Sequence, residues 1–461
     1  MAAADSVRTH SSELKKELGL GDLVLTQILY VVGSHWVGVA AKLGAQQIVF
    51  WLLALVFFYG PLTAVVIHLN RSMPLEGGLY QWAKLGFNDF IGFLVGWNLW
   101  LYIILFMSSQ GMVISANIAY AIGLDWLGGS KWFILLVTIS LVAFLIAVTV
   151  LGLSVGKWFQ NAGGIAQIVT FGALLLVPFL SLSIGKLHEY HPLAMTMPAV
   201  SLLSLNIFGK ISMGAMSGFE YVAILAGECK SPARTIGRSV VIASPIIALM
   251  FILGTSAILA YVSPEQVDLV GPIPQVLSIA FRGFRWAGWI GPVVILMLVA
   301  RQLGACTLAV AGSTRLPMVA GWDNLLPGWF SKLHPKYKTP VNSILFVAGM
   351  ILITGLITLV GAAQQEAFQI LDNASGIFYA LAYLVMFAIP IASRRAPLWL
   401  RMAAVSGFAV TLLYCVLSIF PIIEVGSWWK FGVKIGGVIL GANFVGAGLY
   451  WVERGKAIGR E

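Results

Sequence analysis

Long runs of apolar residues alternate with short polar segments along almost the whole chain. A helix that crosses a membrane needs roughly 20 apolar residues. The runs are continuous rather than apolar at every second position, so they predict spanning helices and not the strands of an outer-membrane barrel. Twelve runs can be delimited. They cover residues 21–42, 47–69, 89–122, 132–151, 159–184, 204–227, 239–262, 287–312, 341–361, 367–391, 400–421 and 432–452.

Composition indicates the same class of protein. Of the 461 residues, 59% are hydrophobic and 10% are charged, whereas a soluble domain carries about 25% charged residues. The chain lacks the polar residues to cover a water-facing surface, which excludes a soluble enzyme, a disordered scaffold and a nucleic-acid binder. The polar first 20 residues lack the apolar core of a signal peptide, and three scattered cysteines are too few for a disulfide framework. The sequence therefore predicts an all-α integral membrane protein.

The 28 lysines and arginines predict how the spans are oriented. Cytoplasmic loops of membrane proteins carry an excess of these residues. With the N-terminus placed inside, 19 fall in inside segments, eight fall in outside segments, Lys210 among them, and Arg301 lies within a span. We therefore expect a protein of the cytoplasmic (inner or plasma) membrane whose terminal segments, 1–20 and 453–461, are both cytoplasmic.

Two of the spans contain glycines and polar residues where helix is expected. The first includes Gly33-Ser34-His35-Trp36-Val37-Gly38, and the sixth includes Gly214-Ala215-Met216-Ser217-Gly218-Phe219-Glu220. Glycine costs about 1 kcal/mol relative to alanine inside a helix and lets the backbone unwind and approach a ligand closely. Unwound backbone at membrane depth is tolerated where it lines a cavity or binds something. The alternative is that these glycines only let helices pack closely.

The two interruptions occupy corresponding places in the chain, because they lie five spans apart. Such a pair indicates an inverted-repeat transporter with a site near the midplane. The repeats would be residues 21–184 and 204–391, with two further helices in 400–452. Exposed amides at the first break favour a carboxylate, and exposed carbonyls at the second favour an ammonium group. The candidate substrate-binding residues are Gly33, Ser34, His35, Gly38, Gly214, Met216, Ser217 and Gly218.

Four places in the sequence carry recognisable motifs. They are Val32-Gly33-Ser34, then Pro74 to Tyr80, then Ser217 to Glu220 with Glu228 to Pro232 and Arg234, and finally Arg315 with Asp323 to Pro327 and Thr339-Pro340. In this order and spacing they resemble the amino acid–polyamine–organocation (APC) transporter superfamily. The resemblance implies a LeuT-type fold of two inverted five-helix repeats plus two extra helices, with twelve transmembrane helices. It also implies alternating access and transport of amino acids or related amines.

The sequence departs from the family pattern in three ways. His35 stands where the first-helix motif usually has a glycine. Met213, Gly214 and Met216 stand where the sixth helix often has aromatic residues, which is either drift or a roomier, softer pocket, because methionine adapts its shape. Many sodium-independent relatives carry a lysine thought to replace a bound sodium ion, and here that position is Gln167. The coupling ion therefore does not follow from the resemblance.

Several ionisable residues lie at membrane depth, where a charge costs at least about 2.5–3.5 kcal/mol. In related antiporters the glutamate that matches Glu220 is linked to proton sensing, so Glu220 is the candidate for proton coupling; the alternative is a carboxyl that only fixes helix packing. His35 could titrate, bind substrate or satisfy the unwound backbone. Arg301 needs an anionic or carbonyl partner, which could be a substrate anion or Glu220. For Asp372 a structural role is favoured over a gate.

The sequence gives little support for a sodium site, a metal site or an enzymatic activity. Thr307 is the main mid-helix hydroxyl of the eighth span, which is little for a sodium site and favours sodium-independent exchange or proton-linked transport. The pair His188 and His191 lacks further metal ligands, and no phosphate loop or hydrolase constellation stands out. We expect no cofactor, no metal, no catalytic residue and no nucleic-acid partner. The expected partners are a small-molecule substrate, a coupling proton and the lipid bilayer.

Three functions are consistent with these features. The leading hypothesis is a secondary active transporter, a permease or exchanger, that moves amino acids by alternating access. A polyamine or organocation transporter of the same fold is the alternative within transport. A membrane sensor that binds an amino acid without moving it is the alternative from another class. It is disfavoured because a long signalling tail would be expected, and about twenty residues precede the first span and nine follow the last.

Overall fold

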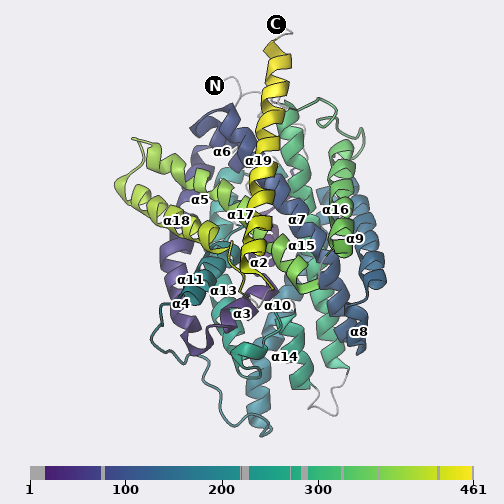
Figure 1. Cartoon of the computed structure of the whole chain (residues 1–461), viewed down its shortest axis with the longest axis vertical. Coiled ribbons are helices and arrows are strands. Elements are labelled where there is room, and N and C mark those ends of the chain that lie inside the picture. Colours follow the sequence, from purple (N-terminus) through teal and green to yellow (C-terminus); the bar gives the residue numbers. More distant parts are fainter. Residues whose placement is uncertain are drawn as a thin grey trace.

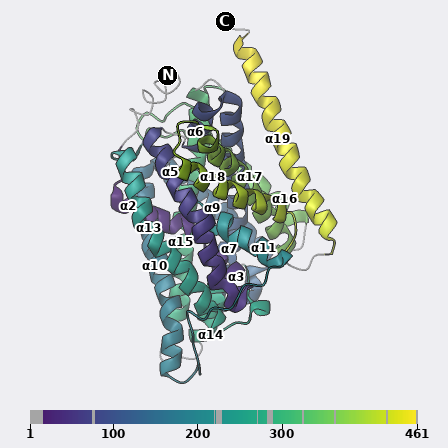
Figure 2. The same cartoon turned by 90° about the vertical axis from the view of Figure 1, so that its left-hand side faces the viewer.

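The computed structural model of the protein describes residues 16–73, 78–218, 220, 228–269, 271–281, 289–322, 326–361, 364–422 and 426–458. Within these ranges the regular structure is helical, apart from one isolated bridge between Leu18 and Cys229. The helices form an elongated bundle (Figures 1 and 2). We name its two ends after short helices that lie there: the α6 end, with α6 (Leu79–Gly86), and the α14 end, with α14 (Pro272–Phe281).

The first five predicted spans all form helices. The first is broken into α2 (Leu20–Val31) and α3 (Ser34–Ala41), which are bent by 42° relative to each other. The second contains a π-helical turn, η2, in its middle. The bounds of the second to fifth spans are η1 (Gly44–Gln46), α4 (Gln47–Ala54), η2 (Leu55–Tyr59) and α5 (Gly60–Ser72), then α7 (Asp89–Ile122), α9 (Lys131–Leu151) and α10 (Leu153–Ser183). A short helix, α8 (Asp125–Gly128), connects α7 and α9.

The sixth span changes its helix type on the way to the predicted interruption. It begins as α11 (Leu202–Gly209) and continues as the π-helical segment η3 (Lys210–Ala215). Of its remaining part, residues 219 and 221–227 lie outside the described residues. The next spans are α13 (Pro232–Leu259), α15 (Ile290–Trp322), α16 (Val341–Gly361) and α17 (Gln364–Ala392), with η5 (Pro264–Gln266) and α14 in the connection before α15.

Two further helices complete the described chain. They are α18 (Leu398–Leu417) and α19 (Trp428–Ile458). Helix α19 runs along one side of the bundle and is separated from most of it (Figure 2). Only 17% of an apolar 18-residue stretch of α19 is buried inside the bundle, so most of the apolar side chains of this helix face outward. Such a surface is stable when it faces lipid.

The described residues confirm a multi-pass, all-helical membrane protein. Nine helices among them are long and apolar enough to cross a membrane, and the bent pair α2–α3 makes ten. Each of the twelve predicted runs overlaps a helix of the described structure. In two of them, the apolar helix that counts as a candidate span is shorter, at Leu202–Ala215 and Val341–Leu356. The count of twelve and the division into two repeats stay predictions.

Small residues bring the site-bearing helices α2, α10 and α15 close together. A Cβ atom on Gly304 of α15 would lie 2.7 Å from the carbonyl oxygen of Phe159 and 3.1 Å from Cα of Gly163, both in α10. A Cβ atom on Gly164 would lie 3.1 Å from the carbonyl oxygen of Leu25 in α2. Because these neighbours are backbone atoms, they cannot move aside as a side chain can. We call these contacts of α10 with α2 and α15 the seam. The seam therefore fixes the distance between the first and eighth spans.

Substitution of Gly304 by alanine is expected to destabilise the protein by about 1–3 kcal/mol, because the added methyl group overpacks the seam. Gly172→Ala is the matched control, because a Cβ atom there meets nothing within 4 Å in the described structure and alanine favours helix. Thermal unfolding of both purified variants measures the difference. Equal melting temperatures would show that the seam can relax.

Candidate functional site

A cavity of about 90 Å³ lies where the two interrupted spans meet. Its wall comes from the α2–α3 break, η3, α7, α15, α17 and α18. Aromatic and polar side chains dominate this wall. They include Tyr30, Ser34, His35, Trp36, Tyr102, Phe106, Gln110, Ser217, Arg301, Gln302, Asp372, Tyr379 and Tyr414. A water molecule needs roughly 10–15 Å³ of such space, so the cavity has room for several waters or a small polar solute.

The first span breaks at Val32 and Gly33. The Gly33 amide donates to the carbonyl of Val31, 2.9 Å away, and not to a carbonyl four residues earlier as in a helix. Helix α3 then begins at Ser34, and the amides of a first helical turn have no partner within the helix. Ser34 and His35 carry two of these amides, and both residues line the cavity. The break therefore places the positive end of a helix dipole at the cavity wall.

The freed carbonyl of Val32 is held by side chains from two other spans. Gln167 of α10 donates to it through Nε2 at 3.1 Å, and Arg301 of α15 donates through Nη2 at 3.4 Å. Gln167 is completely buried and is not one of the residues that line the cavity. Gln167 therefore stabilises the break without forming part of the cavity wall.

The space beside Gly214 is filled by an aromatic ring. A Cβ atom on Gly214 would lie 2.2 Å from the indole of Trp36. That indole packs beside the imidazole of His35, with ring centroids 4.0 Å apart. Of the two alternatives considered for Met213, Gly214 and Met216, the roomier pocket is not seen beside Gly214, because α3 supplies an aromatic ring where the sixth span has none.

Glu220 is buried beside the cavity and bonds to hydroxyl groups. Its carboxylate accepts hydrogen bonds from Tyr379 and Tyr383, which lie one turn apart on α17. The amide of Gly218 donates to it at 3.3 Å. Glu220 forms no ion pair with Arg301 in this structure. Of the two partners considered for Arg301, Glu220 is therefore not the one observed.

Tyrosines form an aromatic layer on the side of the cavity that faces the α6 end. Tyr379 stacks on Tyr102 with ring centroids 4.2 Å apart, and the hydroxyls of Tyr102 and Tyr30 are 3.2 Å apart. All three tyrosines line the cavity. The sequence interpretation missed this layer. Its only local signal is the spacing of Tyr379 and Tyr383, which puts two hydroxyls on one face of a helix.

A second cavity, of about 360 Å³, adjoins the first toward the α14 end. The two share His35, Trp36 and Asp372, and the second also includes Lys210. Counting Lys210 with the outside segments is wrong, because it is 3% exposed within η3 and its Nζ lies 2.5 Å from Oδ1 of Asn373. Its partners are on α17, far away in the sequence, so the hydropathy pattern could not reveal them.

A family model described as amino acid permease matches residues 19–440. The chain belongs to the amino acid permease family.

Two relatives and one solved structure are similar to the chain. The branched-chain amino acid permease BcaP of Bacillus subtilis is 24% identical over 78% of this chain and 80% of that protein. The probable agmatine/putrescine antiporter AguD of Lactococcus lactis is 20% identical, over 81% of this chain and 78% of that one. The crystal structure of MhsT in complex with L-phenylalanine is similar in fold, with a TM-score of 0.60, 13% identity, and coverage of 88% of this chain and 98% of that chain. The APC resemblance and the LeuT-type fold are confirmed.

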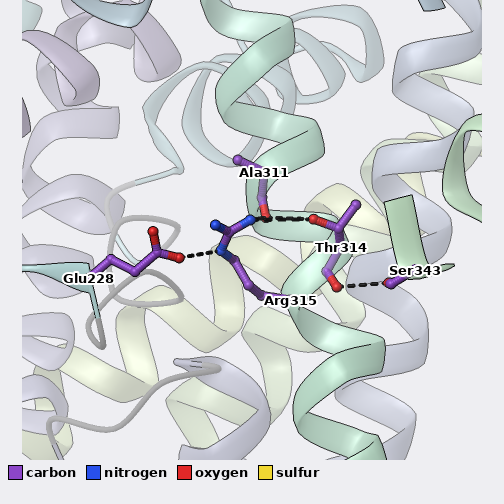
Figure 3. Close-up of polar contacts among 5 residues, drawn as sticks. All are labelled: Glu228, Ala311, Thr314, Arg315 and Ser343. Atoms are coloured by element: carbon purple, nitrogen blue, oxygen red, sulfur yellow. Dashed lines mark hydrogen bonds and ion pairs between the residues drawn. The ribbon is translucent and has the colours of Figure 1, made fainter. Parts of the chain in front are cut away.

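At the α6 end, a buried ion pair joins the eighth span of the permease to the segment after the sixth. Nε of Arg315 donates to Oε1 of Glu228 at 2.6 Å, and the two side chains are 3% and 6% exposed. Arg315 also donates to the carbonyl of Ala311 at 2.8 Å. The carbonyl of Thr314 accepts from the hydroxyl of Ser343 on α16, also at 2.8 Å (Figure 3). The arginine is therefore fixed by its own helix and by the carboxylate across the bundle.

The segment before α2 adds backbone hydrogen bonds to this contact. The amides of Glu17 and Leu18 donate to the carbonyl of Glu228 at 3.0 and 3.1 Å, and the amide of Lys230 donates to the carbonyl of Leu18 at 2.9 Å. Nζ of Lys157 at the start of α10 lies 3.3 Å from the carboxylate of Glu17. Three separate segments of the permease thus meet around Glu228.

Six of the predicted site residues of the permease are not part of the cavity wall: Gln167 and Glu220, described above, and Gly38, Met216, Gly218 and Thr307. Gly38 packs against Pro272, because a Cβ atom there would lie 2.8 Å from the proline ring. Met216 is buried in the core. Gly218, with φ of +119°, donates to Glu220 and to the Tyr383 hydroxyl. The Thr307 hydroxyl donates to the carbonyl of Gly304 within its own helix, at 2.7 Å.

Proposed function

We propose that this permease is a secondary active transporter that moves amino acids across the membrane by alternating access. The observation that carries the proposal is the broken first span, whose first-turn amides at Ser34 and His35 lie at the wall of a buried cavity. A substrate carboxylate would bind these amides. Backbone carbonyls between Gly214 and Ser217, on the other interrupted span, would bind the ammonium group.

The two ends of the bundle fit one state of an alternating-access cycle. Toward the α14 end the binding cavity adjoins the larger second cavity. Toward the α6 end it meets the tyrosine layer and, beyond that, the ion pair of Glu228 and Arg315. We propose that the α14 end is extracellular, that the α6 end and both termini are cytoplasmic, and that residues 21–184 and 204–391 are the two repeats whose relative motion exchanges these states.

The proposed coupling is sodium-independent, either proton-linked or by exchange. A sodium site in this region would need hard oxygen ligands, and the Thr307 hydroxyl already bonds to Gly304. Glu220, in contrast, bonds to tyrosine hydroxyls and an amide rather than to a fixed cation. A carboxyl with neutral partners can gain and lose a proton without breaking an ion pair.

Uptake into proteoliposomes, with proton and sodium gradients imposed separately, tests the function and its coupling. We expect uptake of at least one of the twenty standard amino acids, stimulated by an inward proton gradient or by amino acid preloaded inside. We expect no dependence on the sodium gradient. A rate that follows sodium and ignores pH would contradict the proposed coupling. Failure of every amino acid to enter would contradict the function itself.

Agmatine and putrescine belong in the same uptake experiment. The name of the relative AguD states these amines, and a carrier of organic cations has the same fold. Uptake of either amine in preference to all amino acids would establish the alternative function.

A further inference from the structure

Arg301 is a buried charge that the contacts within the cavity wall do not balance. It lies in the middle of α15, lines the cavity and is 6% exposed. A guanidinium stays protonated in proteins, and burying a charge is unfavourable unless it is paired. Among the described residues, no carboxylate forms a salt bridge with Arg301.

The hydrogen bonds of Arg301 occupy only part of its capacity to donate hydrogen bonds. Nη1 donates to the neutral amide oxygen of Gln302 at 2.5 Å. Nη2 reaches the carbonyl of Val32 at 3.4 Å, which is long for a hydrogen bond. Nε has no hydrogen-bond partner in the part of the chain that the structure describes. Since a guanidinium has five N–H donors, an incoming acceptor would find several of them available.

The acidic residues closest to the cavity, Glu220 and Asp372, form no ion pair or hydrogen bond with Arg301 in the described structure. The carboxylate of Glu220 accepts from Tyr379 and Tyr383. Asp372 lines both cavities, shares the second with Lys210, and forms no salt bridge with Arg301. The guanidinium of Arg301 is therefore left with neutral acceptors only.

Other donors surround the same space. The contact with Val32 places the guanidinium next to the break, and α3 begins two residues later with the free amides of Ser34 and His35. Nε2 of the His35 ring also has no partner among the described residues, and the ring lines the cavity. A guanidinium, a helix N-terminus and an imidazole around one small cavity are the chemistry of a carboxylate site.

We propose that Arg301 binds the carboxylate of the transported substrate and holds it against the amides of Ser34 and His35. This inference rests on the proposed transport function and narrows it to a substrate class. The permease takes α-amino acids, because only a carboxylate compensates the buried guanidinium. It rejects amines without a carboxylate, such as agmatine and putrescine.

The first test needs no variant. Binding of each standard L-amino acid to the purified permease is measured by ligand-induced thermal stabilisation, and the tightest binder is then compared with its own amide and its decarboxylated amine. We expect both analogues to bind about a hundredfold more weakly or worse, because each leaves Arg301 unpaired. Equal affinity for acid and amide would overturn the inference while leaving amino acid transport intact. If no amino acid binds and none is taken up, the proposed function fails, and this inference fails with it.

The second test changes the guanidinium of the protein instead of the carboxylate of the ligand. Arg301→Gln is expected to weaken binding of the acid by a similar factor and to leave binding of the amide within a few-fold of its original value. Arg301→Lys should lie between, since it keeps the charge and loses the planar fork. Arg394→Gln is the control, because it removes the same charge from an exposed position. A folded Arg301→Gln protein that binds the acid normally would overturn the inference, and if this variant does not fold, the comparison of acid with amide decides.

Discussion

Replacing Glu228 by alanine is expected to open the α6 end of the permease. The substitution removes the carboxylate that Arg315 contacts at 2.6 Å, and breaking a buried ion pair in this way costs about 3 kcal/mol or more. The cost falls on the closed conformation, because the guanidinium of Arg315 would be hydrated once the end is open. Cys229 is a native reporter, since it is 1% exposed and pairs with Leu18 in the closed conformation. Its reaction with a maleimide should accelerate on the order of a hundredfold.

The experiment uses purified protein in which Cys306 and Cys415 are replaced by alanine, so that Cys229 is the only thiol. Glu189→Ala is the matched control, because it removes a carboxylate that is 81% exposed and lies 3.7 Å from Nε2 of His191. The double variant Glu228→Ala, Arg315→Ala should react more slowly than Glu228→Ala alone, because no buried charge is left over. An unchanged rate in Glu228→Ala would show that the pair does not hold the α6 end closed.

The bounds of the spans are the part of the fold that the sequence predicts best. The third run, 89–122, coincides with α7, Asp89–Ile122. Both of its ends carry local signals: the Asn88 side chain accepts from the amide of Ile91, and Gly123 adopts a left-handed conformation with φ of +71°. N-capping side chains and C-terminal glycines act within one helical turn, so they can be recognised without knowing the fold.

The sequence predicts the site only where it depends on local backbone. The break at Gly33 follows from a glycine motif and is present. Trp36 opposite Gly214 and Lys210 beside Asn373 depend on residues more than 150 positions apart. The sequence leaves the space at Gly214 open between two alternatives and wrongly places Lys210 outside the spans. A single sequence gives no distance between such positions, so the size of a pocket and the burial of a lysine cannot be read from it.

The described residues contain two buried glutamates, Glu220 and Glu228, with opposite surroundings. Glu228 faces a guanidinium in a buried ion pair. Glu220 faces two tyrosine hydroxyls and one amide. One of these tyrosines, Tyr379, also lines the binding cavity. Of the two, Glu220 is therefore the one that bonds to a residue of the cavity wall and to neutral groups.

Glu220→Gln is expected to remove the pH dependence of uptake while leaving substrate binding largely intact. The side chain keeps its shape, and a tyrosine hydroxyl can accept from the new amide as readily as it donated to the carboxylate. A gradient of one pH unit is worth about 1.4 kcal/mol per proton, or a tenfold accumulation of substrate. The variant should lose this accumulation and retain exchange of external for internal amino acid, as measured in proteoliposomes at fixed membrane potential.

Two outcomes separate proton coupling by Glu220 from a purely structural role. Tyr383→Phe is the comparison, because it removes one hydrogen bond from the carboxylate without removing the titratable group. If Glu220 carries the coupled proton, Tyr383→Phe shifts the pH profile of uptake but keeps its slope, whereas Glu220→Gln abolishes the pH dependence. If both variants lose uptake at every pH together with thermal stability, the carboxyl only fixes the packing of α17 against the sixth span. Because binding, exchange and pH response are measured on the same proteoliposomes, a loss confined to the pH response assigns the proton to Glu220.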